Sequence, residues 1–240
     1  MEKAKKIKLF IGLSYLILVI TFLIFFFSKF SLQEITSYDF IKENRLYFLE
    51  LKSSNLFILS LIFIFLTILW VFPFLGFGSP IALLGGFIFG KWIGTIVVVL
   101  GLSIGATMLY AFGNFFLKEI IREKFLNRFK NLEIKFKNSE FIYLLIYRFV
   151  GGIPWQLSCL LPTIFNVKVK NFFFASFIGI IPQIFLAVSI GSGLEKVIDR
   201  NSELPNLKDI IFSKEVYVPM LAFVGLVLIC IFLRKLFYKN

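Results

Sequence analysis

The chain has 240 residues, of which 59% are hydrophobic, and it carries a formal net charge of +12 at pH 7. It contains no histidine, which excludes imidazole catalysis, metal ligation by histidine and a histidine pH switch. The basic residues flank long apolar stretches, so they indicate contact with a membrane surface and argue against nucleic acid as a partner. The two cysteines, Cys159 and Cys230, lie far apart in apolar runs, which favours free buried thiols over a disulfide.

The N-terminal region predicts a retained spanning helix. Four lysines precede nineteen uncharged residues, 9–27. That run is longer than the core of a signal peptide, roughly 7 to 15 residues, and no small-residue cleavage site follows it before Lys29. We therefore expect a first span with its N-terminus in the cytoplasm. Residues 28–54 mix four basic and four acidic side chains with scattered apolar ones, which predicts one or two short external helices at the membrane interface.

Two long apolar blocks follow. Between residues 53 and 117 the chain carries one charged side chain, Lys91, and between residues 141 and 194 it carries three. A membrane-spanning helix needs about 20 consecutive apolar residues, yet proline and glycine interrupt both blocks. Backbone that departs from a helix at membrane depth is tolerated only where protein or a wet cavity covers it. The interruptions are therefore the places where function is expected.

The first block predicts a hairpin that enters the membrane and returns, followed by a span. Pro73 and Pro80, with the glycines between them, divide the block into two arms and a longer stretch. The excess of basic residues places the N-terminus, residues 114–140 and the C-terminus inside, because positive residues favour the cytoplasm. Because residue 54 is expected outside and residue 114 inside, the chain must cross the membrane an odd number of times between them. A re-entrant hairpin over 55–90 and a span over 92–113 satisfy this condition.

The second block repeats the pattern from the other face. Residues 141–167, interrupted at Gly151, Gly152 and Pro154, are expected to dip in from the cytoplasm, and residues 172–193 to cross outward. An external segment and a last span over 216–233 complete the chain.

The predicted fold is thus an all-α polytopic membrane protein with four full spans and an inverted repeat of two re-entrant hairpins, each followed by a spanning helix. Residues 1–54 hold the cytoplasmic tail, the first span and the interfacial helices; residues 55–195 form the repeat, and residues 196–240 hold the external segment and last span. A multi-pass protein of the bacterial inner membrane, with both termini cytoplasmic, is expected.

Acidic residues are missing from both apolar blocks. None lies between Glu50 and Glu119 or between Glu140 and Glu195, so a membrane-embedded carboxylate pair for metal, glycosidic or proton-relay chemistry has no candidates. No nucleophile motif, phosphate loop or metal-ligand spacing occurs elsewhere. We therefore expect neither an enzyme nor a cofactor, and the same absence disfavours a small-ion channel or exchanger.

Arg148 is the charged residue that calls for explanation, because it lies inside the second hairpin with a long uncharged stretch after it. A charge at such depth costs a few kcal/mol and by default marks a functional site. Its guanidinium stays charged, so it needs an anion or a wet cavity. The candidate partners are the carbonyls at Gly151, Gly152 and Pro154, an interfacial glutamate, or a lipid phosphate. The alternative is an arginine that snorkels to the headgroups.

Other polar and aromatic residues receive smaller roles. Gln156, Asn166 and Gln183 carry amides that could satisfy carbonyls freed by Pro154 and Pro182, and this structural reading is favoured over substrate binding. The spacing of Gly101 and Gly105 predicts close helix packing. Trp92, Trp155 and Tyr147 are expected as interfacial anchors, and Lys91, Lys168 and Lys170 as headgroup contacts.

The residues from 70 to 195 resemble the DedA or VTT-domain family, also called SNARE-associated Golgi proteins. In that family an arginine leads a hairpin that ends in a proline-aromatic pair, and the next helix carries Phe, Gly, Pro and a terminal Gly. The matching residues of the second half are Arg148, Pro154, Trp155, Phe177, Gly179, Pro182 and Gly191, and those of the first half are Pro80, Gly86, Phe89, Gly90, Gly94, Gly101 and Gly105.

The chain also departs from that family pattern. Gly151 stands where a proline is frequent, Gln156 and Cys159 stand at frequent asparagine positions, and Asn114 replaces an arginine. The acidic residues of the bacterial branch are missing, so the chain looks closer to the branch resembling the yeast Golgi protein.

The resemblance implies lipid movement, because eukaryotic relatives scramble phospholipids and some bacterial ones are linked to recycling of undecaprenyl phosphate. Membrane lipids with phosphate headgroups are then the expected partners, with assembly into a homo-oligomer left open. The candidate substrate-binding residues are Arg148, Gly151, Gly152, Pro154, Gln156 and Gln183. The alternative is a membrane scaffold or homeostasis protein that transports nothing.

Overall fold

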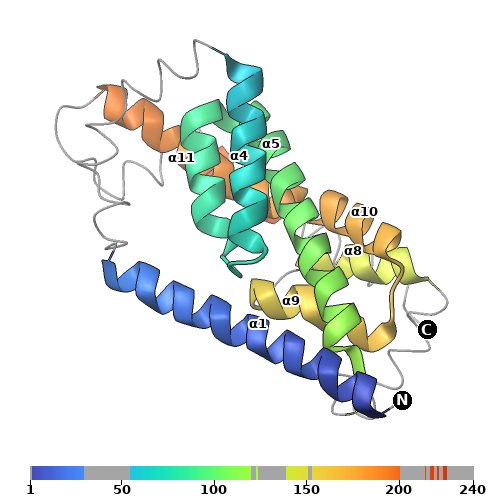
Figure 1. Ribbon diagram of the computed structural model, residues 1–240. Helices are drawn as coiled ribbons and strands as arrows, with labels where there is room; N and C mark the ends of the chain where they lie inside the picture. Colours follow the sequence, from blue (N-terminus) through green and yellow to red (C-terminus); the bar gives the residue numbers. More distant parts are fainter. Residues whose placement is uncertain are drawn as a thin grey trace, which may run out of the picture. The chain divides into compact units, whose positions relative to one another are not determined.

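The computed structural model describes residues 2–29, 55–119, 123, 139–150, 153–200, 214, 217, 218, 221, 224 and 225. All regular structure among them is helical, which confirms the all-α class (Figure 1). The helices are α1 (Glu2–Lys29), α4 (Leu56–Val71), α5 (Gly78–Phe116), α8 (Glu140–Val150), α9 (Trp155–Leu160), the 3-10 helix η2 (Leu161–Phe165), α10 (Val169–Gly179) and α11 (Ile181–Arg200).

The chain divides into two compact units. The first comprises residues 1–78 and 99–180, and the second comprises residues 79–98 and 181–240. Helix α5 contributes its first half to the second unit and its second half to the first. Three predicted regions lie mostly outside the described residues: the interfacial segment 28–54, the cytoplasmic segment 114–140, and the segment 196–240 with the last span.

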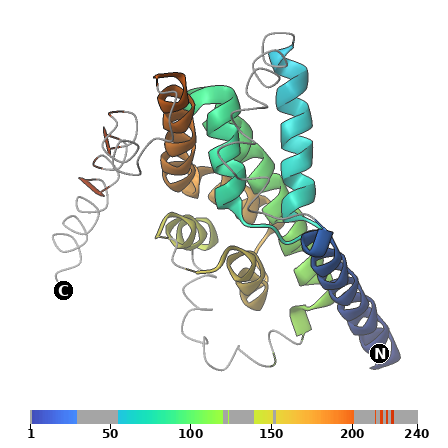
Figure 2. The same ribbon diagram turned by 90° about the vertical axis from the view of Figure 1, so that its left-hand side faces the viewer.

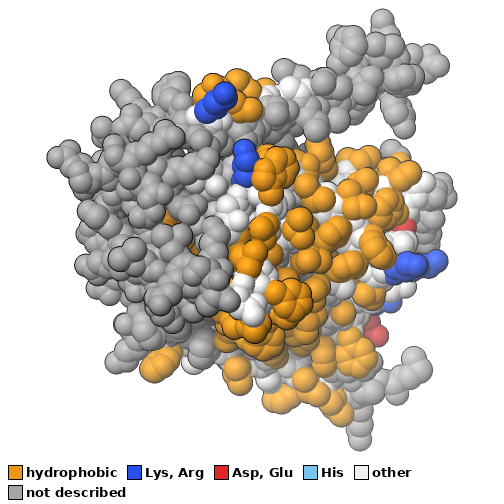
Figure 3. Space-filling view, turned by 90° about the horizontal axis from the view of Figure 1, so that it is seen from above, with side chains coloured by type: hydrophobic (Ala, Val, Ile, Leu, Met, Phe, Trp, Pro, Cys, Tyr) orange, Lys and Arg blue, Asp and Glu red, His pale blue; other side chains and the backbone are white. Residues whose placement is uncertain are grey.

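Helix α4 begins at a side-chain cap and is apolar on all sides. The Asn55 side-chain oxygen accepts a hydrogen bond from the Ile58 backbone N–H at 3.1 Å, which satisfies one of the free donors of the first turn. One face of α4 is exposed, and its exposed residues are Phe57, Ile58, Leu61, Ile62, Phe65 and Leu66. Exposed apolar rows of this size are rare on water-soluble surfaces. Apolar side chains also cover much of the described surface in Figure 3, as lipid contact requires.

The opposite face of α4 packs on α5 through small residues (Figure 2). A Cβ atom placed on Gly101 would lie 2.7 Å from Thr67, and one on Gly105 would lie 2.8 Å from Val71. A side chain at either glycine would therefore separate the two helices. The spacing of the two glycines had predicted this close helix packing.

A short turn over residues 72–77 joins α4 to α5. Hydrogen bonds between this turn and the last turn of α4 hold it in place. Pro73 offers no backbone N–H, so the helix ends there. The Gly76 N–H donates to the Trp70 carbonyl at 2.7 Å, and the Trp70 indole donates to the Phe77 carbonyl at 2.8 Å. The indole also lies where a Gly76 side chain would be, because a Cβ there would come within 2.2 Å of it.

Helix α1 packs on this turn from within the same unit. The Tyr15 hydroxyl donates to the Pro73 carbonyl at 2.9 Å, and its ring lies 5.9 Å from Phe72 and 4.5 Å from Phe112. Gly12 faces Phe116, near the end of α5. The N-terminal helix thus covers the turn that interrupts the first apolar block.

Helix α5 is interrupted at Gly90, whose φ of 74° and ψ of 178° are not helical. Only glycine adopts such a conformation readily. The predicted boundary between hairpin 55–90 and span 92–113 falls at this residue. By length and composition, the part of the chain that the structure describes holds one helix able to cross a membrane, Gly78–Phe116, or two if the bent pair Val169–Gly179 and Ile181–Gly193 counts as one span.

That bent pair differs from the single straight span predicted over 172–193. Helix α10 ends at Gly179, and α11 starts at Ile181 with a bend of 44°. Pro182 has no N–H for the hydrogen bond that would continue α10, and its ring crowds the preceding turn. Hydropathy alone could not show this bend, because Val169–Gly179 and Ile181–Gly193 together are apolar enough for one span.

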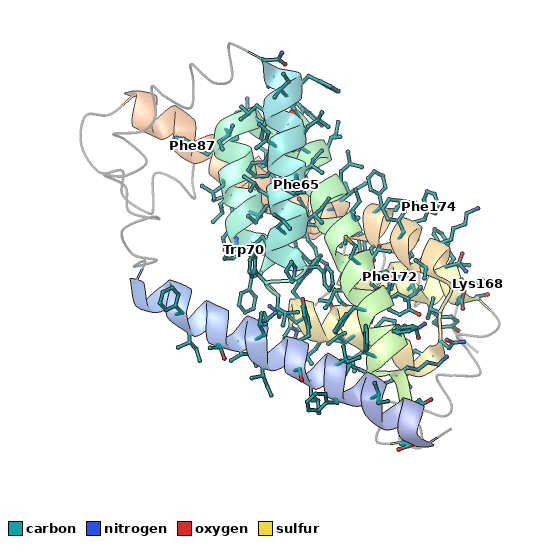
Figure 4. All side chains as sticks on the ribbon, viewed as in Figure 1. Phe65, Trp70, Phe87, Lys168, Phe172 and Phe174 are labelled. Atoms are coloured by element: carbon teal, nitrogen blue, oxygen red, sulfur yellow. The ribbon has the colours of Figure 1, made fainter. Side chains whose placement is uncertain are left out.

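The core of the first unit lies where α5, α8 and α10 meet. Tyr110 and Phe172 are fully buried and stack with ring centroids 4.4 Å apart. The Tyr110 hydroxyl donates to the Val167 carbonyl at 2.5 Å. Figure 4 shows Phe172 on the side of α10 that faces α5.

We expect Tyr110→Phe to destabilise the protein by about 1–3 kcal/mol, because the buried Val167 carbonyl would lose its donor. Thermal unfolding in detergent, followed by near-UV circular dichroism, measures the effect. Tyr15→Phe is the matched control: its hydroxyl is only partly buried, so its loss should be smaller. Equal losses of stability in the two variants would contradict a larger contribution from the buried hydrogen bond of Tyr110.

In the second unit, α11 packs on the first half of α5 through two reciprocal glycine contacts. A Cβ on Gly86 would lie 2.0 Å from the Val188 carbonyl oxygen, and a Cβ on Gly191 would lie 2.0 Å from the Leu83 carbonyl oxygen. Gly94 is similarly close to Gly85 and Val188. The two helices thus meet backbone to backbone.

Candidate functional site

Arg148 lies in the last turn of α8 and is only 4% exposed. Leu144, one turn earlier on the same face, is also buried, and α8 packs on α10. The guanidinium is therefore held inside the first unit. This differs from an arginine that snorkels outward to the headgroups.

Neutral side chains of two other helices accept from this guanidinium. Its Nε donates to Ser176 Oγ of α10 at 3.0 Å, and its Nη1 donates to Ser158 Oγ of α9 at 2.7 Å. Its Nη2 lies 3.5 Å from the Cys159 thiol. Arg148 thus joins α8, α9 and α10.

Three aromatic rings surround the same charge. The guanidinium carbon lies 4.8 Å from the centroid of Phe172, 5.3 Å from that of Trp155 and 6.0 Å from that of Tyr147. Aromatic faces attract cations, and more strongly when water is excluded. The three rings and the two serine hydroxyls together stabilise the permanent positive charge of Arg148 among the apolar helices.

Gly179 allows α10 to approach Arg148. A Cβ on Gly179 would lie 2.7 Å from the Arg148 Cβ and 3.1 Å from the Leu145 carbonyl oxygen. This close approach brings Ser176, one turn earlier in α10, within reach of Nε. The family motif glycine at this position is therefore part of the site. Phe177 is half-buried and its ring lies 6.1 Å from that of Phe173.

Gln156 connects α9 to the turn of the first hairpin. Its amide nitrogen donates to the Leu75 carbonyl at 2.5 Å. Leu75 and Phe72 also pack against the buried cluster that contains Cys159 and Phe172. Figure 4 shows Trp70 at the end of α4 that leads into this turn. The turn at 72–77, which interrupts the first apolar block, therefore meets α9, which follows the interruption of the second block, within the first unit.

Polar groups at the N-terminal ends of α8 and α10 interact with each other. Glu140 accepts from the Lys168 backbone N–H at 3.2 Å and from the Asn171 amide. The Lys118 ammonium donates to the Asn166 side-chain oxygen at 2.5 Å. The Asn166 amide thus pairs with a lysine instead of a freed carbonyl, and Lys168 and Lys170 are exposed (Figure 4 labels Lys168).

The remaining predicted binding residues have different positions. The Pro154 carbonyl accepts from the Ser158 N–H at 2.8 Å and so belongs to the first turn of α9. Gly151 and Gly152 lie outside the described residues. Gln183 is half-buried on α11, in the second unit.

The sequence interpretation missed three partners of Arg148. Ser158, Ser176 and the Cys159 contact were not foreseen, although a serine inside a run such as FFFASFIG is a signal worth weighing. Trp155 and Tyr147, expected as interfacial anchors, lie with their rings beside Arg148. Trp92 is 68% exposed and its ring lies 5.4 Å from that of Phe185.

Comparisons with known proteins agree with the resemblance. The profile of the family described as VTT domain matches residues 72–193. A Transmembrane protein 41 homolog of Caenorhabditis elegans is 23% identical over 120 residues, which is 49% of this chain and 49% of that protein. The chain therefore spans about half the length of the curated relative it matches. No solved structure matches the chain.

Proposed function

The chain belongs to the VTT domain family of membrane proteins, and from that premise we propose that it moves a phosphate-bearing lipid headgroup, of a phospholipid or a polyprenyl phosphate, across the bilayer. No bond is made or broken in this process, so the proposal involves no enzymatic step. The single observation that carries it is the buried guanidinium of Arg148, held by Ser158 and Ser176 inside apolar helices.

The physical problem for such a protein is the phosphate charge. An ion at the centre of a bilayer costs several kcal/mol or more, which makes unaided crossing slow. A fixed cation lowers this barrier because a charge-assisted hydrogen bond replaces part of the lost hydration. In the proposed mechanism the headgroup passes close to Arg148 while the acyl or prenyl chains stay in the surrounding lipid.

The wild-type protein provides the first test. Proteoliposomes containing a fluorescent headgroup-labelled phospholipid are treated with dithionite, which bleaches only the outer leaflet. We expect bleaching to proceed well beyond the outer-leaflet half when the protein is present, and to stop near half in protein-free vesicles. A second arm uses labelled polyprenyl phosphate. If bleaching stops at half with both lipids, the proposed transport does not occur.

One observation favours the alternative of a scaffold that transports nothing. The described hydrogen bonds of Arg148 all go to groups of the protein itself, so the guanidinium also serves to join three helices. A protein in which it did only this would fail the dithionite test while remaining folded.

A further inference from the structure

Two buried polar atoms beside Arg148 have no hydrogen-bond partner among the described residues. They are the Tyr147 hydroxyl and the Trp155 indole nitrogen. A buried donor without a partner destabilises the folded protein, and in native proteins such atoms usually have a partner. Two of them at one place need a common explanation.

Other aromatic polar groups of the same unit have protein partners. The Trp70 indole donates to the Phe77 carbonyl, the Tyr110 hydroxyl to the Val167 carbonyl, and the Tyr15 hydroxyl to the Pro73 carbonyl. The fold therefore satisfies these aromatic polar groups, whereas the unbonded atoms of Tyr147 and Trp155 belong to rings that adjoin a guanidinium. Among the described residues, buried side-chain oxygens of Ser103, Asn114 and Ser189 also lack a partner, but no cation–aromatic contact involves them.

The chemistry of the three groups defines what fits between them. An indole N–H and a guanidinium only donate hydrogen bonds, and a tyrosine hydroxyl can donate one. The missing partner must therefore be an acceptor, and a nearby fixed positive charge favours an anionic one. Phosphate oxygens meet both requirements.

We propose that the Tyr147 hydroxyl and the Trp155 indole donate hydrogen bonds to the phosphate oxygens of a lipid headgroup next to Arg148. This assignment deepens the proposed function and rests on it. Since two of the three groups can only donate, the site recognises the phosphate shared by all candidate lipids. An ammonium substituent beyond the phosphate gains nothing from the indole or the guanidinium, because it only donates hydrogen bonds and carries the same charge as Arg148.

The three tryptophans of the chain permit a direct test of binding. The full-length protein, labelled with ¹⁵N in its indoles, is prepared in a maltoside detergent that carries no phosphate. A short-chain phosphatidylglycerol and a short-chain polyprenyl phosphate are titrated separately, with the matching diacylglycerol as the phosphate-free control. We expect the Trp155 N–H resonance to move with both phosphate lipids, while the Trp70 resonance, already bonded to Phe77, stays in place.

Trp155→Phe and Tyr147→Phe then test the role of each donor. Each change keeps an aromatic ring over Arg148 and removes one donor, so affinity for the phosphate lipids should fall about 10-fold or more. Trp92→Phe is the matched control, because the Trp92 side chain is exposed and belongs to the second unit. It should leave the affinity unchanged.

The outcomes separate this site from the transport proposal. If Trp155 moves with phosphate lipids but bleaching stops at half, the site stands and transport fails. If lipid is transported while the Trp155 resonance is unmoved at saturating phosphate lipid, transport stands and the site is wrong. Movement of Trp155 with diacylglycerol as well would show binding of the acyl chains and would overturn the phosphate assignment.

Discussion

Arg148→Gln slows lipid movement about 10- to 100-fold in the dithionite assay, if the guanidinium meets the phosphate during crossing. The magnitude follows from the loss of charge-assisted hydrogen bonds, worth about 1.5–3 kcal/mol. Glutamine is shorter and neutral, so it cannot replace the attraction between the cation and the headgroup. Folded yield and thermal stability, measured on the same preparations, should fall much less than the rate.

Ser176→Ala is the matched control for the structural part of this effect. It removes one acceptor of the Arg148 Nε but keeps the charge. We expect Ser176→Ala to lower stability and leave most of the transport rate. If it slows transport as much as Arg148→Gln does, the role of Arg148 is to join the helices and not to bind phosphate. Equal rates for Arg148→Gln and the wild type would also reject the proposal.

Gly86→Ala strongly destabilises the second unit. The added Cβ would lie 2.0 Å from the Val188 carbonyl oxygen, and backbone cannot move aside as a flexible side chain can. Overpacking of this kind costs about 3 kcal/mol or more, enough to lower the midpoint of thermal unfolding by roughly 10 °C in a chain of this size. Gly191→Ala should behave alike, because its Cβ meets the Leu83 carbonyl oxygen at 2.0 Å.

Gly225→Ala is the control for these changes. Nothing lies within 4 Å of a Cβ placed there, so stability should be unchanged or slightly higher, since alanine favours helix. Size-exclusion chromatography after heating gives the comparison in detergent. A Gly86→Ala variant as stable as the wild type would mean that α5 and α11 do not meet at these glycines.

The sequence predicted the helical class and most of the interruptions, because these depend on local chemistry. Pro73 ends α4, and Gly90 interrupts α5. Each follows from a missing N–H or a missing Cβ. Arg148 was also found from the sequence, since one charge in an apolar block needs no structure to be noticed.

The partners of Arg148 could not be predicted in this way. In water, the polar face of a helix reveals its rotation, but α4 and α10 are apolar on the side that meets lipid as well as on the side that meets protein. Hydropathy therefore does not show that Ser176 and Trp155 face Arg148. The bend at Ile180 was missed for the same reason: apolar residues continue on both sides of it.

The reciprocal glycine contacts have a consequence for biogenesis. Gly86 and Gly191 lie far apart in the chain, and a ribosome makes the N-terminal one first. The first half of α5 must therefore enter the membrane long before its partner α11 exists, with the bare backbone around Gly86 facing lipid or an insertion chaperone. Packing of this unit therefore waits until α11 has been made, and chains released before residue 181 are expected to be substrates for quality-control proteases.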